Sequence, residues 1–223
     1  MDALGERWLV VLAKRPVAGQ VKTRLARTLG DAAAAELQAA FLADTLRHAA
    51  RVRDARRLLA VAPRGSAGWF AELDPGAEVV EQVEGDLGAR LAAAFAEAFA
   101  RGAARVVAVG SDAPQQDAEV LERAFAALAP GRVVLRPSDD GGYTLVGLAA
   151  PAPRLFERVP WSTPEVLQAT ERRARALGLE VARLEPGFDV DEERDLARLA
   201  GEIDAGRADC PATRAALRSR PRP

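Results

Sequence analysis

Short apolar runs alternate with longer stretches rich in alanine, leucine and arginine along most of this chain. The short runs have the composition of buried strands, and the longer stretches repeat their apolar residues at helical spacing. Such alternation is typical of an α/β domain with a mainly parallel sheet. Strands are expected over residues 8–13, 58–62, 78–83, 105–109, 132–135, 144–148 and 179–184, and helices over about 31–52, 87–101, 115–128, 164–177 and 192–201.

Length and composition fit a single domain. A chain of 223 residues with 49% hydrophobic content is sufficient for one continuous core. We expect this domain to cover residues 1–205. Residues 206–223 are rich in proline and arginine, and we expect them to form a loosely attached tail.

Charge and cysteine content exclude several classes of protein. The 31 basic and 32 acidic residues give a net charge of -1, which provides no overall field for binding nucleic acid or an anionic membrane. Cys210 is the only cysteine, so neither an internal disulfide nor a cysteine cluster for zinc is possible. No apolar stretch is long enough to span a bilayer, and the N-terminus lacks a signal-peptide pattern. We therefore expect a cytoplasmic protein with no nucleic acid partner.

The two lysines of the chain, Lys14 and Lys22, lie in one loop, and every other Lys/Arg position is arginine. Lysine carries a compact ammonium on a flexible stem that can follow a phosphate, whereas arginine offers a rigid planar fork. The loop follows the expected strand at 8–13, and Gly19 permits close approach to its backbone. These features favour a phosphate site, although a solvated loop without function explains them as well. The loop is not a P-loop, because Val21 and not glycine precedes Lys22.

Three aspartates also follow expected strands. Asp112 comes after the run at 105–109, and Asp189 and Asp191 come after the run at 179–184. Ligands of open α/β sheets bind beyond the carboxyl ends of the strands, so these side chains are expected to meet there. Magnesium binds few protein oxygens and leaves its other positions to water and phosphate, which makes the three carboxylates candidate ligands. For Asp112, capping of the following helix is an equally good explanation.

A turn of unusual composition, Asp139-Asp140-Gly141-Gly142-Tyr143, lies between two expected strands. An Asp-Gly hairpin turn explains part of it. The turn follows a later strand than Asp112, and its glycines leave room for close approach, so we expect it to face a second substrate. In the alternative interpretation, Tyr143 is a core aromatic.

Six short motifs stand out along the chain: KRPVAGQVKTRLA at 14–26, QVEGDLGARL at 82–91, GSDAP at 110–114, DDGGYTLVGL at 139–148, WSTPEVL at 161–167 and DVDEERDL at 189–196. In this order they resemble a bacterial group of glycosyltransferase-A-like proteins in the nucleotide-diphospho-sugar transferase superfamily. That group is related to the guanylyltransferases that activate 2-phospholactate or phosphoenolpyruvate. The chain departs from the commoner pattern at Ala113 and over residues 192–194, and both departures leave the aspartates in place.

The resemblance implies a three-layer αβα sandwich with a mixed, mainly parallel sheet. It also implies that the loop at 14–24 covers the nucleotide phosphates and that residues 139–143 face the second substrate. Asp112, Asp189 and Asp191 would then bind Mg²⁺ or Mn²⁺.

We therefore predict a magnesium-dependent transferase that moves a nucleotidyl group from a nucleoside triphosphate to a small phosphorylated acceptor and releases pyrophosphate. The alternatives are glycosyl transfer from a nucleotide-diphospho-sugar and a non-catalytic nucleotide-binding regulatory module. An ion pair with Asp86 on the same helix explains Arg90 as well as nucleotide binding does, and Trp161 fits either the core or a pocket wall. The expected catalytic residues are Lys22, Arg24 and Asp112; the nucleotide-binding residues are Lys14, Gly19, Lys22, Thr23, Arg24 and Arg90; the acceptor-binding residues are Asp139, Asp140, Gly141, Gly142, Tyr143 and Trp161; and the metal ligands are Asp112, Asp189 and Asp191.

Overall fold

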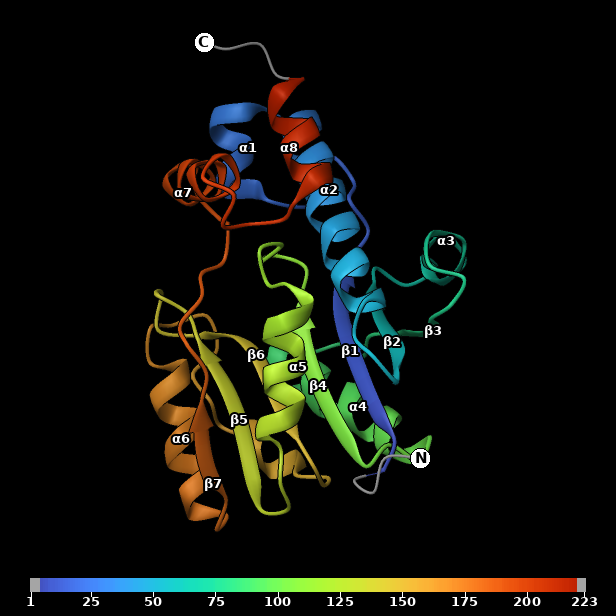
Figure 1. Cartoon of the computed structure of the whole chain (residues 1–223), viewed down its shortest axis with the longest axis vertical. Coiled ribbons are helices and arrows are strands. Elements are labelled where there is room, and N and C mark those ends of the chain that lie inside the picture. Colours follow the sequence, from blue (N-terminus) through green and yellow to red (C-terminus); the bar gives the residue numbers. More distant parts are fainter. Residues whose placement is uncertain (1–4, 220–223) are drawn as a thin grey trace.

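The computed structural model describes residues 5–219, which form a seven-stranded sheet with helices on both faces (Figure 1). The strand order is β3-β2-β1-β4-β6-β5-β7. Within this described part, β6 runs antiparallel to both β4 and β5, and the other neighbouring strands are parallel. The prediction of a mixed, mainly parallel sheet is confirmed. The strands are β1 (Arg7–Lys14), β2 (Ala55–Ala62), β3 (Glu78–Glu81), β4 (Arg105–Gly110), β5 (Arg132–Pro137), β6 (Tyr143–Leu148) and β7 (Glu180–Arg183).

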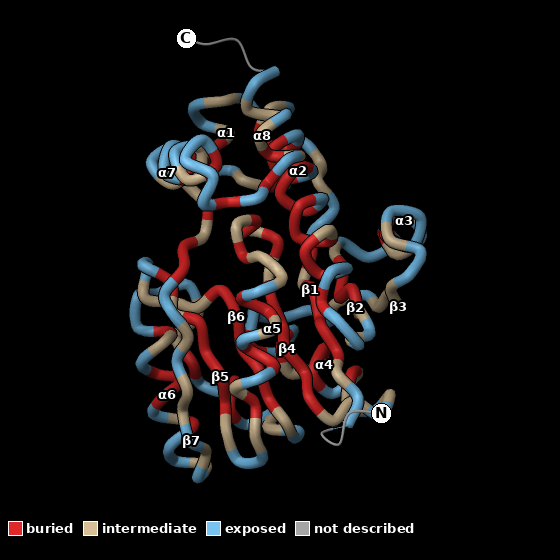
Figure 2. The backbone as a smooth tube through the Cα atoms, viewed as in Figure 1, coloured by how far each residue is buried: buried red, intermediate tan, exposed pale blue. Residues whose placement is uncertain are grey.

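Alternation of side chains along the strands divides the core into two layers. In β1, the buried Leu9 and Val11 face one layer, and the buried Trp8 and Val10 face the other. Figure 2 shows that the central strands are buried over most of their length. The predicted three-layer sandwich is therefore present. The first layer is covered by α2 (Asp31–Ala50), α3 (Ala67–Leu73) and α5 (Ala118–Ala127), and the second by α4 (Leu87–Ala100), the 3-10 helix η1 (Pro153–Phe156) and α6 (Val166–Ala176).

A further apolar cluster lies beyond the carboxyl ends of β1 and β4. It brings together α1 (Thr23–Leu29), α2, α7 (Glu193–Asp204) and the segment leading into α8 (Pro211–Arg218). Leu25, Phe41 and Leu199 are fully buried in it. In Figure 1 these helices lie above the sheet, on the side where β1 and its parallel neighbours end.

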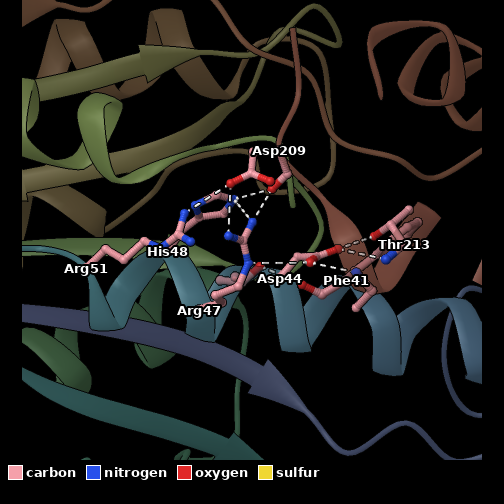
Figure 3. A network of polar contacts seen from close by, with 9 residues as sticks. Phe41, Asp44, Arg47, His48, Arg51, Asp209 and Thr213 are labelled. Carbon is pink, nitrogen blue, oxygen red and sulfur yellow. Dashed lines mark hydrogen bonds and ion pairs between the residues drawn. The ribbon is translucent and has the colours of Figure 1, made fainter. Parts of the chain in front are cut away.

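The prediction of a loosely attached tail is wrong for residues 206–219, because α8 packs against α2. Asp44 of α2 accepts hydrogen bonds from the backbone N–H groups of Ala212 (3.0 Å) and Thr213 (2.8 Å) and from the Thr213 hydroxyl (2.7 Å; Figure 3). A carboxylate from another helix thus satisfies the free N–H groups of the first turn. Pro211 fits there because the first turn tolerates proline. Residues 220–223 of the expected tail lie outside the described residues.

The segment before α8 is held by side chains from the C-terminal end of α2. Arg47 and Arg51 each donate to the Asp209 carboxylate, at 2.9 and 3.0 Å, and His48 Nε2 lies 2.9 Å from the Asp209 carbonyl oxygen (Figure 3). His48 is almost fully buried by these contacts. The only histidine of the chain therefore has a packing role.

Local capping explains where the observed helices differ from the expected ones. α5 begins at Ala118 and not at residue 115, because the Asp117 carboxylate accepts a hydrogen bond from Val120 N at 2.9 Å. α1 and α3 were not assigned from the sequence, since seven residues show too little periodicity. None of the helices in the described part is both long and apolar enough to cross a bilayer.

Candidate active site

Lys22 lies between two of the predicted aspartates at the carboxyl edge of the sheet. Its ammonium forms ion pairs with Asp112 and with Asp191, the latter at 2.9 Å, and its side chain is only 3% exposed. Burial alone would lower the pKa of Lys22, but the two carboxylates outweigh this effect and the pKa is raised. Lys22 itself has a left-handed backbone (φ 46°) as the residue preceding α1. The predicted lysine loop therefore delivers one cation into a carboxylate site.

Asp112 reaches this site because it stands two residues after the end of the buried strand β4. It does not cap α5, since Asp117 does so. Its backbone oxygen accepts a hydrogen bond from Val190 N at 2.8 Å, which fixes the segment that carries Asp189 and Asp191. The capping interpretation of Asp112 is therefore wrong, and its functional role stays a prediction.

Asp189 completes a group of carboxylates around the same edge. It accepts a hydrogen bond from the Ser138 hydroxyl at 2.9 Å. Burial and the neighbouring Asp112 carboxylate raise the pKa of Asp189 to about 7, although the Ser138 hydrogen bond acts in the opposite direction. A further cation close to these groups would lower that pKa, because it would offset both effects.

A cleft of about 390 Å³ opens beside the carboxylates. Arg24, Glu192 and the turn at 138–140 contribute to its walls. Arg24 and Glu192 also line a second, wider and more open hollow beside α1 and α7. Arg198 crosses the cleft wall: it pairs with Asp139 and stacks over the Phe188 ring at 3.9 Å. The residues lining the cleft are Arg24, Ser138, Asp139, Asp140, Phe188, Asp189, Asp191, Glu192, Arg194, Asp195 and Arg198.

Sequence reasoning missed Ser138, Arg194 and Arg198 in this cleft. Arg194 and Arg198 stand four residues apart in the helix that follows Asp191, so they share one helical face. That spacing was the available signal. The chain is too rich in arginine for two of them to stand out.

The remaining nucleotide-binding candidates lie at the protein surface. Lys14 donates to the Gln20 carbonyl oxygen at 2.7 Å, so it closes its own loop. Gly19 has a left-handed backbone (φ 76°), which the turn of this loop requires. Arg24 is 65% exposed and lies 3.6 Å from Glu192, and Thr23 is exposed.

Arg90 is exposed on α4, away from the residues that line the cleft. The alternative of an Asp86–Arg90 pair also fails, because no such ion pair forms among residues 5–219; Asp86 instead caps α4 by accepting from Ala89 N at 2.8 Å.

Tyr143 and Trp161 do not line the cleft, contrary to the prediction that they contact the acceptor. Their rings pack edge to face at 6.3 Å in the apolar layer. Burial raises the pKa of Tyr143, an effect that the neighbouring Thr170 hydroxyl only partly offsets. The core interpretation of both aromatics therefore describes the structure.

The turn itself lies partly in the cleft. Asp139 and Asp140 line it, whereas Gly141 meets the motif at 161–167: its backbone has φ 87°, and a Cβ there would lie 2.1 Å from the Pro164 carbonyl oxygen. Gly142 donates its N–H to Asp140 at 2.9 Å. The glycines thus serve the turn and its packing, while Asp139 pairs with Arg198 and Asp140 accepts the Gly142 N–H at the cleft wall.

The carboxylates offer the hard oxygen donors that magnesium and manganese prefer. Within residues 5–219, however, no three acidic, histidine or cysteine side chains are gathered as a ready set of metal ligands. The ammonium of Lys22 contacts both Asp112 and Asp191, which is where a metal bound to the two would lie. The donor set fits a divalent cation on the condition that Lys22 yields its place.

Comparison with known proteins identifies the family of this chain. A family model described as an uncharacterised protein conserved in bacteria (DUF2064) matches residues 45–163, which is more than half of the chain. The chain belongs to this family. The matched region includes Asp112 and the turn at 139–143 but not the lysine loop. No protein with a curated description matches the sequence.

Solved structures extend the comparison to the whole chain. A Desulfovibrio desulfuricans protein, described provisionally as a nucleotide-diphospho-sugar transferase, is 31% identical over 95% of this chain and 94% of its own (TM-score 0.85). A nucleotidyl transferase from Methanothermobacter is 16% identical over 90% of this chain and 99% of its own (TM-score 0.63). Rv0371c from Mycobacterium tuberculosis, solved in complex with manganese, is 22% identical over 87% of this chain and 97% of its own (TM-score 0.52). The DUF2064 chain thus has the fold shared by nucleotidyltransferases and nucleotide-diphospho-sugar transferases.

Proposed function

We propose that this DUF2064 protein is a magnesium- or manganese-dependent transferase that moves a nucleotidyl group from a nucleoside triphosphate to a small phosphorylated acceptor. The observation that supports this most directly is the ammonium of Lys22 held between Asp112 and Asp191 at the carboxyl edge of the sheet. A cation beside carboxylates that suit a divalent metal is the usual equipment for phosphate chemistry. The fold of the nucleotidyl transferases supports the same activity.

In this reaction an oxygen of the acceptor phosphate bonds to the α-phosphorus, and the bond from that phosphorus to the bridging oxygen breaks. The electron pair stays with the departing pyrophosphate. Asp112, Asp189 and Asp191 would hold the metal, which supplies positive charge to the phosphates when bound. Lys22 and the exposed Arg24 would turn to the leaving group and stabilise its charge, so catalysis is mainly positioning and electrostatics.

The two halves of the cleft have separate roles in this proposal. The lysine loop and α1 lie on the side of the triphosphate. Asp139 and Asp140, with Arg194 and Arg198, lie on the side of the acceptor. The arginines there would recognise an anionic group of the acceptor, because a guanidinium fork matches phosphate and carboxylate oxygens.

Glycosyl transfer is the second candidate, because the relative that is 31% identical is described provisionally as a sugar-nucleotide enzyme. The same cations would then hold the diphosphate of the donor, while the bond that breaks is at the sugar carbon.

A ligand screen followed by product analysis separates the proposals. Thermal shifts are recorded with nucleoside triphosphates and with nucleotide sugars, each with and without Mg²⁺ or Mn²⁺, since a ligand of the folded state raises its apparent stability. The stabilising donor is then incubated with pools of phosphorylated small molecules, and the products are followed by phosphorus NMR. Metal-dependent release of pyrophosphate supports nucleotidyl transfer, and release of a nucleoside diphosphate supports glycosyl transfer. Nucleotide binding without any turnover would favour the regulatory module instead.

A further inference from the structure

Arg136, in the second half of β5, is a buried arginine that forms no close ion pair among the described residues, although the Asp117 and Asp189 charges act on it from further away. Its residue exposure is 8%. Its guanidinium donates to the Gln116 side-chain oxygen at 2.9 Å and to the Glu185 carbonyl oxygen at 3.2 Å. Burial lowers the pKa of Arg136, so its charge is held at a cost in free energy. An apolar side chain at this position would avoid the cost of burying a charge, so the contacts of the guanidinium indicate why arginine is present.

One of these contacts is the irregular segment between β7 and α7, residues 184–192, which we name the strap. It carries both Asp189 and Asp191, and Figure 1 shows it running from β7 past the end of the sheet to α7. Since the strap has no helix or strand of its own, side chains and single backbone hydrogen bonds determine its position. Three of these are Gly187 N to Pro137 O (2.8 Å), Gln115 Nε2 to Phe188 O (2.6 Å) and Val190 N to Asp112 O (2.8 Å).

The guanidinium also packs against the backbone of the strap. A Cβ at Gly187 would lie 2.6 Å from Arg136 Cζ, so glycine is required here for space and not for a left-handed backbone. On its other side, Arg136 shares the oxygen of Gln116 with the Thr144 hydroxyl (2.9 Å). Gln116 belongs to the loop after β4 that also holds Asp112 and Gln115. Arg136 therefore joins the two segments from which the three aspartates come.

We propose that Arg136 is a positioning residue that fixes Asp189 and Asp191 relative to Asp112. The inference rests on the proposed function in one respect, that these aspartates bind the metal. A guanidinium suits this task because it is planar and donates in fixed directions, so it sets both the distance and the orientation of the strap. A lysine would keep the charge but could not maintain both contacts in one plane.

The test measures the affinity for Mn²⁺ alone, by calorimetry or by electron paramagnetic resonance, so that it does not depend on a known substrate. Arg136→Met should weaken Mn²⁺ binding by about tenfold or more, which is the usual effect of removing a group that orients metal ligands. Arg136→Lys should give an intermediate loss. Nucleotide affinity measured without metal should stay within about threefold of the original protein, since Arg136 does not line the cleft.

Arg132→Met is the matched control. Arg132 lies on the same strand and pairs with Glu180 of β7 at 2.9 Å, at the opposite end of the strand from the strap. Its loss can reduce stability but should leave Mn²⁺ affinity within about twofold. If Arg136→Met does not fold, Gly187→Ala tests the same contact, because it moves the strap while the arginine remains.

Equal Mn²⁺ affinity in Arg136→Met and the original protein would overturn the proposal, as would an equal loss in Arg132→Met. So would failure of the original protein to bind Mn²⁺ at all. If Mn²⁺ binds and Arg136→Met weakens it, yet no nucleotide is turned over, the positioning role stands while the proposed transferase activity fails.

Discussion

At the scale of single residues, the proposed function depends most on Lys22. In the structure its ammonium neutralises Asp112 and Asp191. Under the proposed function, a divalent metal on these carboxylates would displace the ammonium towards the phosphates of a nucleotide. Metal binding and phosphate binding would then be coupled through one side chain.

Replacing Lys22 by methionine tests this coupling. Without metal, Lys22→Met should lose about 1–2 kcal/mol of unfolding free energy, because two half-exposed carboxylates lose their counter-ion. Millimolar Mg²⁺ should stabilise Lys22→Met more than the original protein, and turnover should fall about 100-fold or more. Lys14→Met is the control, since Lys14 is exposed and donates to the Gln20 carbonyl oxygen of its own loop. Equal stability and equal metal response in the two variants would contradict the assignment.

Tyr143 provides a second test at this scale. Because its hydroxyl is buried and faces the core near Thr170, Tyr143→Phe should change the unfolding free energy by no more than about 1 kcal/mol. The KM for the acceptor should remain unchanged. A selective rise in the KM for the acceptor would mean that the Tyr143 hydroxyl contacts the acceptor.

His48 gives the protein a specific pH dependence. Burial and the nearby Arg47 lower the pKa of His48, although the Asp209 carbonyl and the Asp117 and Asp209 charges act in the other direction. The folded state therefore binds the proton less well than the unfolded state. The stability that follows is fully present above the unfolded pKa of about 6.5 and is lost as the pH falls below it.

The measurement is the difference in unfolding free energy between the original protein and His48→Gln from about pH 7.5 to 5.5. This difference should shrink as the pH falls. Because both proteins share the same acidic residues, the contribution of those residues cancels in the difference. Since His48 is the only histidine, its titration can also be followed as a single NMR signal. A difference that stays constant with pH would mean that His48 has its ordinary pKa.

At the scale of elements, the docking of α8 depends on one carboxylate from α2. Asp44 is fully buried and accepts three hydrogen bonds from the first turn of α8. Asp44→Ala leaves those donors unpaired and should cost about 3 kcal/mol, whereas Thr213→Val removes one of them and should cost about 1 kcal/mol. Urea unfolding gives both values.

Cys210 reports on the same docking without unfolding the protein. It is the only cysteine, it is buried, and burial raises its thiol pKa to about 12. A thiol reagent should react slowly with the original protein and much faster with Asp44→Ala, because only an undocked α8 exposes the thiol. Rapid labelling of the original protein would mean that α8 is loosely held after all.

At the scale of the whole molecule, one apolar cluster covers the carboxyl edge of the sheet. It is formed by α1, α2, α7 and the segment before α8. Removal of residues 206–223 would expose apolar groups that include Phe41, Leu199 and Ile203. We expect the shortened chain to lose at least about 3 kcal/mol of unfolding free energy and to bind nucleotide more weakly. Removal of residues 220–223 alone is the control. An unchanged melting temperature after the longer truncation would restore the prediction of a separate tail.

The sequence by itself determined the sheet, the layers and the edge at which the site lies. Apolar periodicity is local, so it can be read without knowledge of distant contacts. It placed the loop that carries Lys22 after β1 and placed Asp112 after β4. The chain geometry of parallel strands then brings such residues to one edge. The order of the motifs supplied the resemblance to nucleotide-diphospho-sugar transferases. The family match and the fold comparison support this resemblance at the level of the fold.

Only the tertiary structure decided how these groups use the edge. The ion pairs of Lys22, the core position of Tyr143 and Trp161, and the capping of α8 by Asp44 each join residues far apart in sequence. Which polar group meets which partner depends on distances of a few ångströms set by packing, and a local pattern carries no such information. Arg136 shows the limit most clearly, because in the sequence it is one arginine among many, and its role follows from its burial against the strap.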